Sequence, residues 1–274
     1  MMQAASREAM GAVRNQVNSV LGRFSTTSGL AGLADELYAV ASLLTAQPRL
    51  RRRLADPAST PEQRTGLADA LFEGKISASA LSILDSAVAA RWSAAWDLVD
   101  AIETSGDDVL LAAAESDDVI ATVEDELFRV ERLLDAQSPL TTLLDEATAD
   151  PGKRADLIEQ LLEGKANPVT IALVRHAVTT QRKRSILLAL DDLIRAAGAR
   201  RERSVARVTS AVDMTEAQQN ALADRLSEVY GRRIDVRYAL DPSIRGGLVV
   251  RVGDEVIDGS LVTRLQEVRA AFAG

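Results

Sequence analysis

The sequence predicts a mostly α-helical protein in which two tandem six-helix bundles precede a small C-terminal α+β domain of β-sheet and helix. Three observations support this fold class. Residues 33–75 align with residues 123–165 without a gap, at a constant offset of 90 positions, with 17 identities in 43 positions. Apolar residues in both copies recur at the three- and four-residue spacing of a helix face. After Gly198 the pattern changes to the alternation typical of strands. The predicted domains are 1–105, 106–198 and 199–274.

The first copy is predicted to consist of short helices. A leading helix is expected over 3–21, and the apolar stripe of the next runs from Leu33 to Leu44. Ser59-Thr60-Pro61 supplies a capping hydroxyl and a proline at the first helical position, and Gly74 ends that helix. A longer helical stretch is expected from Ser77 through Trp96 to Ile102.

The second copy repeats this pattern after a joint predicted at Thr104–Asp107. Because Asp107-Asp108 and Asp117-Asp118 carry negative charge, they are interpreted as helix-start residues. Helices are expected at Leu110–Ala114, Val119–Ala136, Leu140–Asp145, Pro151–Leu162, Pro168–Thr180 and from about Arg182 to Ala197.

The C-terminal part is predicted to have the order β-α-β-β-β-α. Thr215 and Gln218 form a capping box that opens the first helix, and Ser260 is expected to cap the last. The strands are expected at Val205–Val212, Ile234–Tyr238, Gly247–Val252 and Glu255–Ile257.

The composition excludes several function classes. Lys and Arg number 32 against 40 Asp and Glu, a formal charge of -8, which disfavours nucleic-acid binding because phosphates call for a basic excess. The chain has no Cys and one His, so thiol chemistry, cysteine zinc sites and most histidine metal sites are excluded. No metal and no cofactor is predicted. No stretch of eighteen apolar residues occurs and the N-terminus is not a secretory signal, so direct membrane insertion is not expected.

Some residues allow both a functional and a structural interpretation. Gly74-Lys75 and Gly164-Lys165 lack the upstream glycine and following Ser/Thr of a phosphate loop, so helix termination is favoured. Trp92 and Trp96 are expected one helical turn apart, as core residues or as partner-binding anchors. A hydrolase using Ser260 and His176 is the enzymatic alternative, but no nucleophile motif supports it.

Residues 241–269 resemble the C-terminal signature of the delta subunit of F-type ATP synthases, the family of the oligomycin-sensitivity-conferring protein. Residues 208–219 resemble the strand-to-helix entry of that family, and the second copy resembles its N-terminal helical domain. The first copy is then an extra domain. The signature positions are Asp241, Pro242, Gly246, Gly247, Gly253, Asp258, Gly259 and Ser260.

The resemblance implies a non-catalytic stator subunit that supports proton-driven ATP synthesis. Its helical part would bind the N-terminal helices of the alpha subunits in the catalytic head, and its C-terminal domain the b subunit of the peripheral stalk. One copy per complex is expected, on the cytoplasmic face of the bacterial cell membrane. The alternative is a general adaptor that binds amphipathic helices of other partners.

The head-binding groove is expected between the first and fifth helices of a copy. The resemblance does not say which copy uses it. The candidate residues are Ala9, Val13, Val17, Leu81, Leu84 and Val88 in the first copy, and Leu110, Ala114, Ile171, Val174 and Val178 in the second.

Overall fold

The computed structural model describes residues 3–24, 27–146, 148–180, 185–203, 205–230, 234–241, 244, 246–252 and 255–258. Two compact units are formed by residues 1–197 and 198–274. The first unit is helical and the second contains a four-stranded sheet. The helices of the first part are α1 (Ala4–Leu21), α2 (Thr27–Ala46), α3 (Pro48–Leu54), α4 (Pro61–Phe72), α5 (Ala78–Ala89), α6 (Ala95–Ser116), α7 (Ile120–Ala136), α8 (Ser138–Asp145), α9 (Pro151–Leu162), α10 (Pro168–Thr179) and α11 (Ile186–Arg203).

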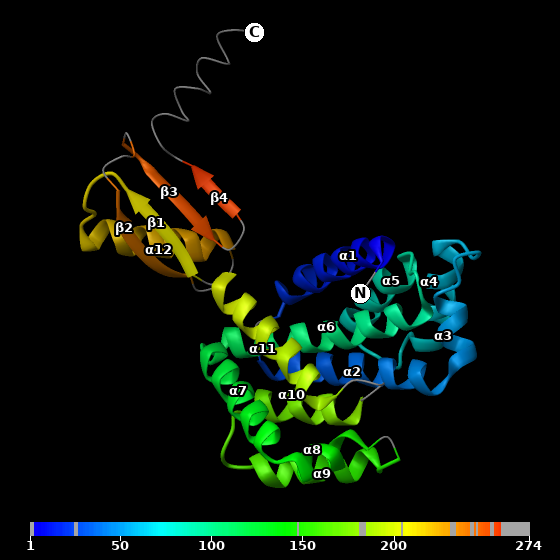
Figure 1. The fold of residues 1–274 in the computed structure, drawn as a ribbon. Coiled ribbons are helices and arrows are strands. Elements are labelled where there is room, and N and C mark those ends of the chain that lie inside the picture. The colour runs from blue at the N-terminus through cyan, green and yellow to red at the C-terminus, as the bar shows by residue number, and fades with distance from the viewer. Residues whose placement is uncertain are drawn as a thin grey trace. The chain divides into compact units, whose positions relative to one another are not determined.

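The internal repeat is visible in the element bounds. Helices α4 and α9 begin and end exactly 90 positions apart, and so do α5 and α10, which also share one pattern of buried and half-buried positions. The repeating unit is therefore five helices, α1–α5 and then α6–α10. Helix α6 contacts α1, α2 and α5 of the first copy and α7 and α10 of the second. The two six-helix bundles thus share α6, which runs through the middle of the helical unit (Figure 1).

The joint predicted at Thr104–Asp107 is wrong, because these residues lie inside the continuous helix α6. The helix ends instead at Ser116, where Asp118 adopts the left-handed conformation (φ 58°) and the Val119 amide donates to the Ala114 carbonyl at 2.8 Å. Packing explains the difference, since α6 is enclosed by both copies and a break at its centre would leave buried backbone groups unpaired.

The predicted helix from Ser77 to Trp96 is interrupted. Helix α5 ends at Ala89, and Trp92 lies in the following break, 6% exposed, with its indole nitrogen donating to the Ala87 carbonyl at 2.7 Å. Trp96 lies in the first turn of α6 and is 41% exposed, and the Arg51 guanidinium lies 3.5 Å from the centroid of its ring. The prediction of a core residue is therefore confirmed for Trp92 and wrong for Trp96.

The predicted caps form as expected. Thr60 and Gln63 make a capping box at the start of α4. Gly74 (φ 72°) and Gly164 (φ 68°) end α4 and α9 in the left-handed conformation, which confirms helix termination at both Gly-Lys pairs. Glu36 accepts hydrogen bonds from the Ser77 amide and hydroxyl at the start of α5.

The second copy repeats the Glu36 contact with Glu126. Its carboxylate accepts from the Asn167 amide at 2.8 Å and from the Thr170 hydroxyl at 2.6 Å, at the start of α10. In each copy, then, the second helix fixes the N-terminus of the fifth through a half-buried carboxylate.

The C-terminal unit has a mixed sheet in the order β2-β1-β3-β4, with β1 parallel to β2 and antiparallel to β3. Its core is formed by Ala206, Val208, Leu226, Ile234, Val250 and Val252. The predicted strand and helix order is confirmed except for the last helix, which lies outside the described residues. The elements are β1 (Val205–Ser210), α12 (Glu216–Tyr230), β2 (Asp235–Leu240), β3 (Leu248–Val252) and β4 (Glu255–Asp258).

Among the described helices, α2 alone is long and apolar enough to cross a membrane by length and composition. In the structure Leu33, Leu37 and Leu44 of α2 are buried in the helical unit. The apolar composition of α2 is thus accounted for by its core position.

Candidate partner-binding surfaces

The seam between α1 and α5 is the first-copy candidate. The two helices are in contact, and five of the six predicted side chains are buried at or below 5% exposure. Leu81 is half-buried and packs against the same core. These side chains hold α1 and α5 together, so a partner helix would lie over the outer surface of the seam rather than on them. The buried residues are Ala9, Val13, Val17, Leu84 and Val88.

The second-copy candidate is the seam between α6 and α10, which are also in contact. Four of its five predicted residues are buried and Ile171 is half-buried. The partner-binding role of both sets stays a prediction. The buried residues are Leu110, Ala114, Val174 and Val178.

Helix α2 of the first copy lies across the second-copy seam. Its Tyr38 ring stacks on the His176 ring of α10, with centroids 3.5 Å apart and planes at 18°. The Tyr38 hydroxyl donates to Asp107 of α6 at 2.7 Å. One turn before, Asp35 pairs with Arg175 of α10 at 3.7 Å. The contact therefore ties α2 to both helices of the seam, and His176 has a packing role.

Close approach of α2 to α6 depends on Gly106. A Cβ atom at this position would lie 2.4 Å from Cε1 of Tyr38, which no real contact permits. Gly106 falls in the predicted joint, and no sequence pattern marks Tyr38 as an interface residue. The signal for this interface was the absence of a side chain at position 106 inside a helical pattern.

Burial shifts the pKa of the Asp107 carboxyl group at this interface. The pKa of Asp107 is raised from 3.8 to about 7, mainly by burial, with the Tyr38 hydrogen bond opposing the shift and Asp108 and Asp192 adding to it. The pKa of Tyr38 is raised well above its ordinary value, first by burial and then by Asp107. The Tyr38–Asp107 contact is therefore costly to ionise.

The outer face of α5 carries the first-copy counterparts of Arg175 and His176, which are Asp85 and Ser86. Asp85 lies near Asp69 of α4, and burial followed by the Asp69 charge raises its pKa to about 6. In the described part of the chain the buried Oδ1 atom of Asp85 has no hydrogen-bond partner. This face therefore carries uncompensated negative charge.

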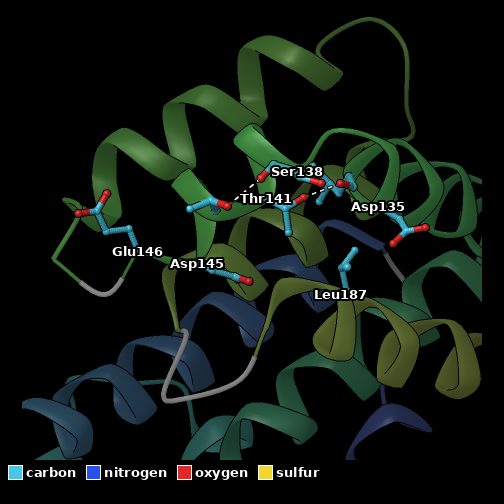
Figure 2. A pocket seen from close by; sticks show the side chains of 8 residues that line it. Asp135, Ser138, Thr141, Asp145, Glu146 and Leu187 are labelled. Atoms are coloured by element: carbon cyan, nitrogen blue, oxygen red, sulfur yellow. Dashed lines mark hydrogen bonds between the residues drawn. The ribbon is translucent and has the colours of Figure 1, made fainter.

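A surface hollow of about 470 Å³ lies in the second copy between α7, α8 and the start of α11 (Figure 2). Three carboxylates reach it, but Asp145 accepts from the Ile186 amide at 2.8 Å and so caps α11, and Glu146 accepts from Thr148. The lining residues are Leu134, Asp135, Ser138, Thr141, Thr142, Asp145, Glu146 and Leu187.

In the first copy an arginine lies at the equivalent position of the repeat. Arg51 occupies the position of Thr141 and donates to the Leu44 carbonyl at 2.9 Å, while its guanidinium stacks on Trp96. In the second copy the Thr141 hydroxyl donates to the equivalent carbonyl of Leu134. In each copy the side chain at this position donates to a carbonyl at the end of the second helix, which is a structural role. The hollow in the second copy is explained by the smaller size of Thr141.

A smaller hollow of about 290 Å³ lies in the first copy and is mainly apolar. Leu43 in it is 42% exposed, and its second-copy counterpart Leu133 is 52% exposed. The lining residues are Ala39, Val40, Leu43, Leu50, Leu71, Phe72, Lys75 and Ile76.

The signature residues of the C-terminal unit are described only in part. Gly246 and Gly247 have φ of 79° and 86°, which favours glycine at both positions, and Asp241 donates its amide to the Ser210 carbonyl at 2.9 Å. Asp258 ends β4 opposite Val249. Pro242, Gly253, Gly259 and Ser260 lie outside the described residues.

Within the residues that the structure describes, no group of three or more His, Asp or Glu side chains could hold a metal ion. The features that the structure does offer are helix faces and packed seams.

Comparisons with known proteins agree in pointing to one family. The family model described as "ATP synthase delta (OSCP) subunit" matches residues 108–272. The ATP synthase subunit delta of Salinispora arenicola is 41% identical over 273 residues, covering 100% of this chain and 99% of that protein. That of Streptomyces avermitilis is 41% identical over 269 residues, covering 98% of each. That of Corynebacterium glutamicum strain R is 40% identical over 275 residues, covering 99% of this chain and 100% of that protein.

Proposed function

Because the chain belongs to the ATP synthase delta (OSCP) subunit family, we propose that it links the catalytic head of an F-type ATP synthase to the peripheral stalk. The family supports a stator role, and the chain itself is a non-catalytic subunit of such a complex. In the proposal, the helical unit binds N-terminal helices of the alpha subunits and the C-terminal unit binds the b subunit. It associates peripherally with the membrane through these subunits, at the cytoplasmic face.

The single observation that carries the proposal is the match to full-length relatives. Because relatives align over 98–100% of this chain, the first copy belongs to the subunit and is not an unrelated fusion. This favours a stator subunit over a general adaptor, since an adaptor would not require the C-terminal signature.

The division into two units supports the proposal that the helical unit and the C-terminal unit bind different partners. The helical part buries a continuous core, and the sheet unit has a separate core around Val208 and Leu226. The two units can therefore carry different partners. A stator interface that resists rotor torque calls for more than about 1,000 Å² of buried surface, which a partner helix or stalk end lying on one unit can supply.

The test is a truncation that ends at Arg203, so that α11 is kept whole. We expect residues 1–203 to retain binding to the purified catalytic head and to lose binding to the b subunit, measured by co-sedimentation and calorimetry. Binding of b by the truncated chain would contradict the assignment of the C-terminal unit. Failure of the full chain to bind the head would contradict the proposed function as a whole.

A further inference from the structure

The chain contains the candidate head-binding seam twice, and the two seams are not equivalent. Helices α5 and α10 occupy matching positions in the repeat, and each contacts the first helix of its copy, α1 or α6. If only the sequence pattern mattered, both seams would accept a partner helix. The surroundings of the two seams differ, however, and this difference decides which is available.

The second-copy seam is covered by the chain itself. Tyr38 of α2 lies 3.5 Å from His176 of α10 and donates to Asp107 of α6, while Asp35 pairs with Arg175. A partner helix in this position would have to displace α2. Since α2 is also packed along α6 through buried leucines, such displacement would open the core of the helical unit.

No described helix plays this part for the first-copy seam. Among its stronger contacts, α5 meets α1, α2, α4 and α6, which belong to its own bundle. The outer face of α5, with Ser82, Asp85 and Ser86 half-buried, thus corresponds to the part of α10 that α2 covers.

The charge at one matched position is reversed between the two faces, from Arg175 to Asp85. In the second copy Arg175 pairs with Glu159 of α9 at 3.1 Å and with Asp35 of the covering helix at 3.7 Å. In the first copy the matching positions are Asp85 and Asp69, two acids. The buried Oδ1 of Asp85 has no hydrogen-bond partner in the described residues. In the second copy, the covering helix α2 places the acidic Asp35 beside the basic Arg175. A helix that covers the first copy is therefore expected to place a basic side chain beside the acidic Asp85.

We propose that the head binds this chain through the α1–α5 face of the first copy alone, with a Lys or Arg of the incoming helix paired to Asp85, while α2 closes the α6–α10 face of the second copy. The proposal rests on the proposed function for the identity of the partner, and goes beyond it in assigning the copy and the charge of the contact.

The copy assignment is tested by a footprint. The chain has no Cys, so single cysteines can be placed in the full chain on the same face of the two helices, S86C on α5 and A172C on α10, which lies one helical turn before His176, the counterpart of Ser86. Maleimide labelling rates are measured with and without the purified catalytic head of the same organism. We expect the head to slow labelling of S86C about tenfold and to leave the rate at A172C unchanged.

Protection of A172C, or a bound head that protects neither cysteine, would overturn the copy assignment while leaving the proposed function intact. If the head does not bind the full chain in a co-sedimentation control, the proposed function fails and this inference falls with it. The two failures are therefore distinguishable.

The charge assignment is tested by Asp85→Asn. This variant removes the repulsion with Asp69, so its thermal midpoint should be equal to or above that of the parent chain, and a binding loss would not come from unfolding. We expect head affinity to fall about fivefold, more at low salt than at high salt. The matched control, Asp156→Asn on the exposed side of α9, should bind as the parent does. Unchanged affinity of the Asp85→Asn variant would overturn the assigned ion pair.

Discussion

The ring of Tyr38 stacks on the ring of His176 with centroids 3.5 Å apart, and this contact joins the two copies of an internal repeat. The counterpart of Tyr38 in the second copy is Phe128, which is 48% exposed. The same position in the repeat thus serves as an interface in one copy and as surface in the other. The duplication did not produce two equivalent modules, because the first lies on the second.

Gly106→Ala is expected to destabilise the protein by about 1–3 kcal/mol, because the added Cβ would lie 2.4 Å from Cε1 of Tyr38 and the ring would have to move. Urea unfolding followed by circular dichroism measures the change. The control is Gly66→Ala in α4, where a Cβ meets nothing within 4 Å and stability should rise by about 0.5–1 kcal/mol. Equal effects of both variants would contradict the close contact.

Tyr38→Phe keeps the stacked ring and removes the donor to Asp107. The lost, partly buried hydrogen bond should cost about 1–2 kcal/mol of the free energy of unfolding. Phe128→Tyr, at the exposed counterpart, adds a hydroxyl in water and should change stability by less than about 0.5 kcal/mol. A neutral Tyr38→Phe variant would show that the hydroxyl contributes nothing to the interface.

Stability should fall with rising pH because of Asp107. Its folded pKa, about 7, lies above the ordinary value of 3.8, so the folded state holds a proton that the unfolded chain has lost. The contribution is fully present below about pH 4 and is lost as pH rises through 7, on the order of 4 kcal/mol at most. Asp107→Asn carries no such proton and should remove this slope.

The measurement is the free energy of unfolding of both chains between pH 5 and 8. The difference between the Asp107→Asn variant and the parent should grow in favour of the variant as pH rises. A constant difference across this range would mean that Asp107 is ionised in the folded protein throughout.

Arg64→Met should be among the most destabilising single changes in the first copy. The buried guanidinium donates to five backbone carbonyls, at the end of α5, just after it and in the segment before α4, including Val88 at 2.6 Å and Ala89 at 2.8 Å. Leaving these acceptors without donors should cost about 3–5 kcal/mol. Arg7→Met on the exposed side of α1 is the control and should be near neutral. Thermal unfolding compares the two.

The elements were largely predictable because their signals are local. Capping residues, left-handed glycines and apolar spacing act within a few positions, and Thr60, Gly74 and Gly164 do in the structure what their sequence context indicated. The strand order of the C-terminal unit followed from alternation in the same way. The interruption at Trp92 was missed because the apolar spacing of α5 continues in phase across it.

The joint between copies was missed for a different reason. Val109–Ala114 is an unbroken apolar run, and every residue in it is buried. Such a run is typical of a helix enclosed on all sides, and this was the available signal that α6 belongs to both bundles. Thr104–Asp107, by contrast, has the composition of a loop, and only packing holds it helical.

The sequence by itself determined the repeat, the helices with their caps, the strand order of the C-terminal unit and, through its signature, the family. Only the tertiary structure decided that the copies share α6 and that Tyr38 and Asp35 of α2 contact α10, a contact that no described residue repeats on α5. The physical reason is that periodicity shows which face of a helix is buried but not what buries it. The contacts that decide it, Tyr38 with His176 and Asp35 with Arg175, join residues far apart in the chain and depend on how the helices pack.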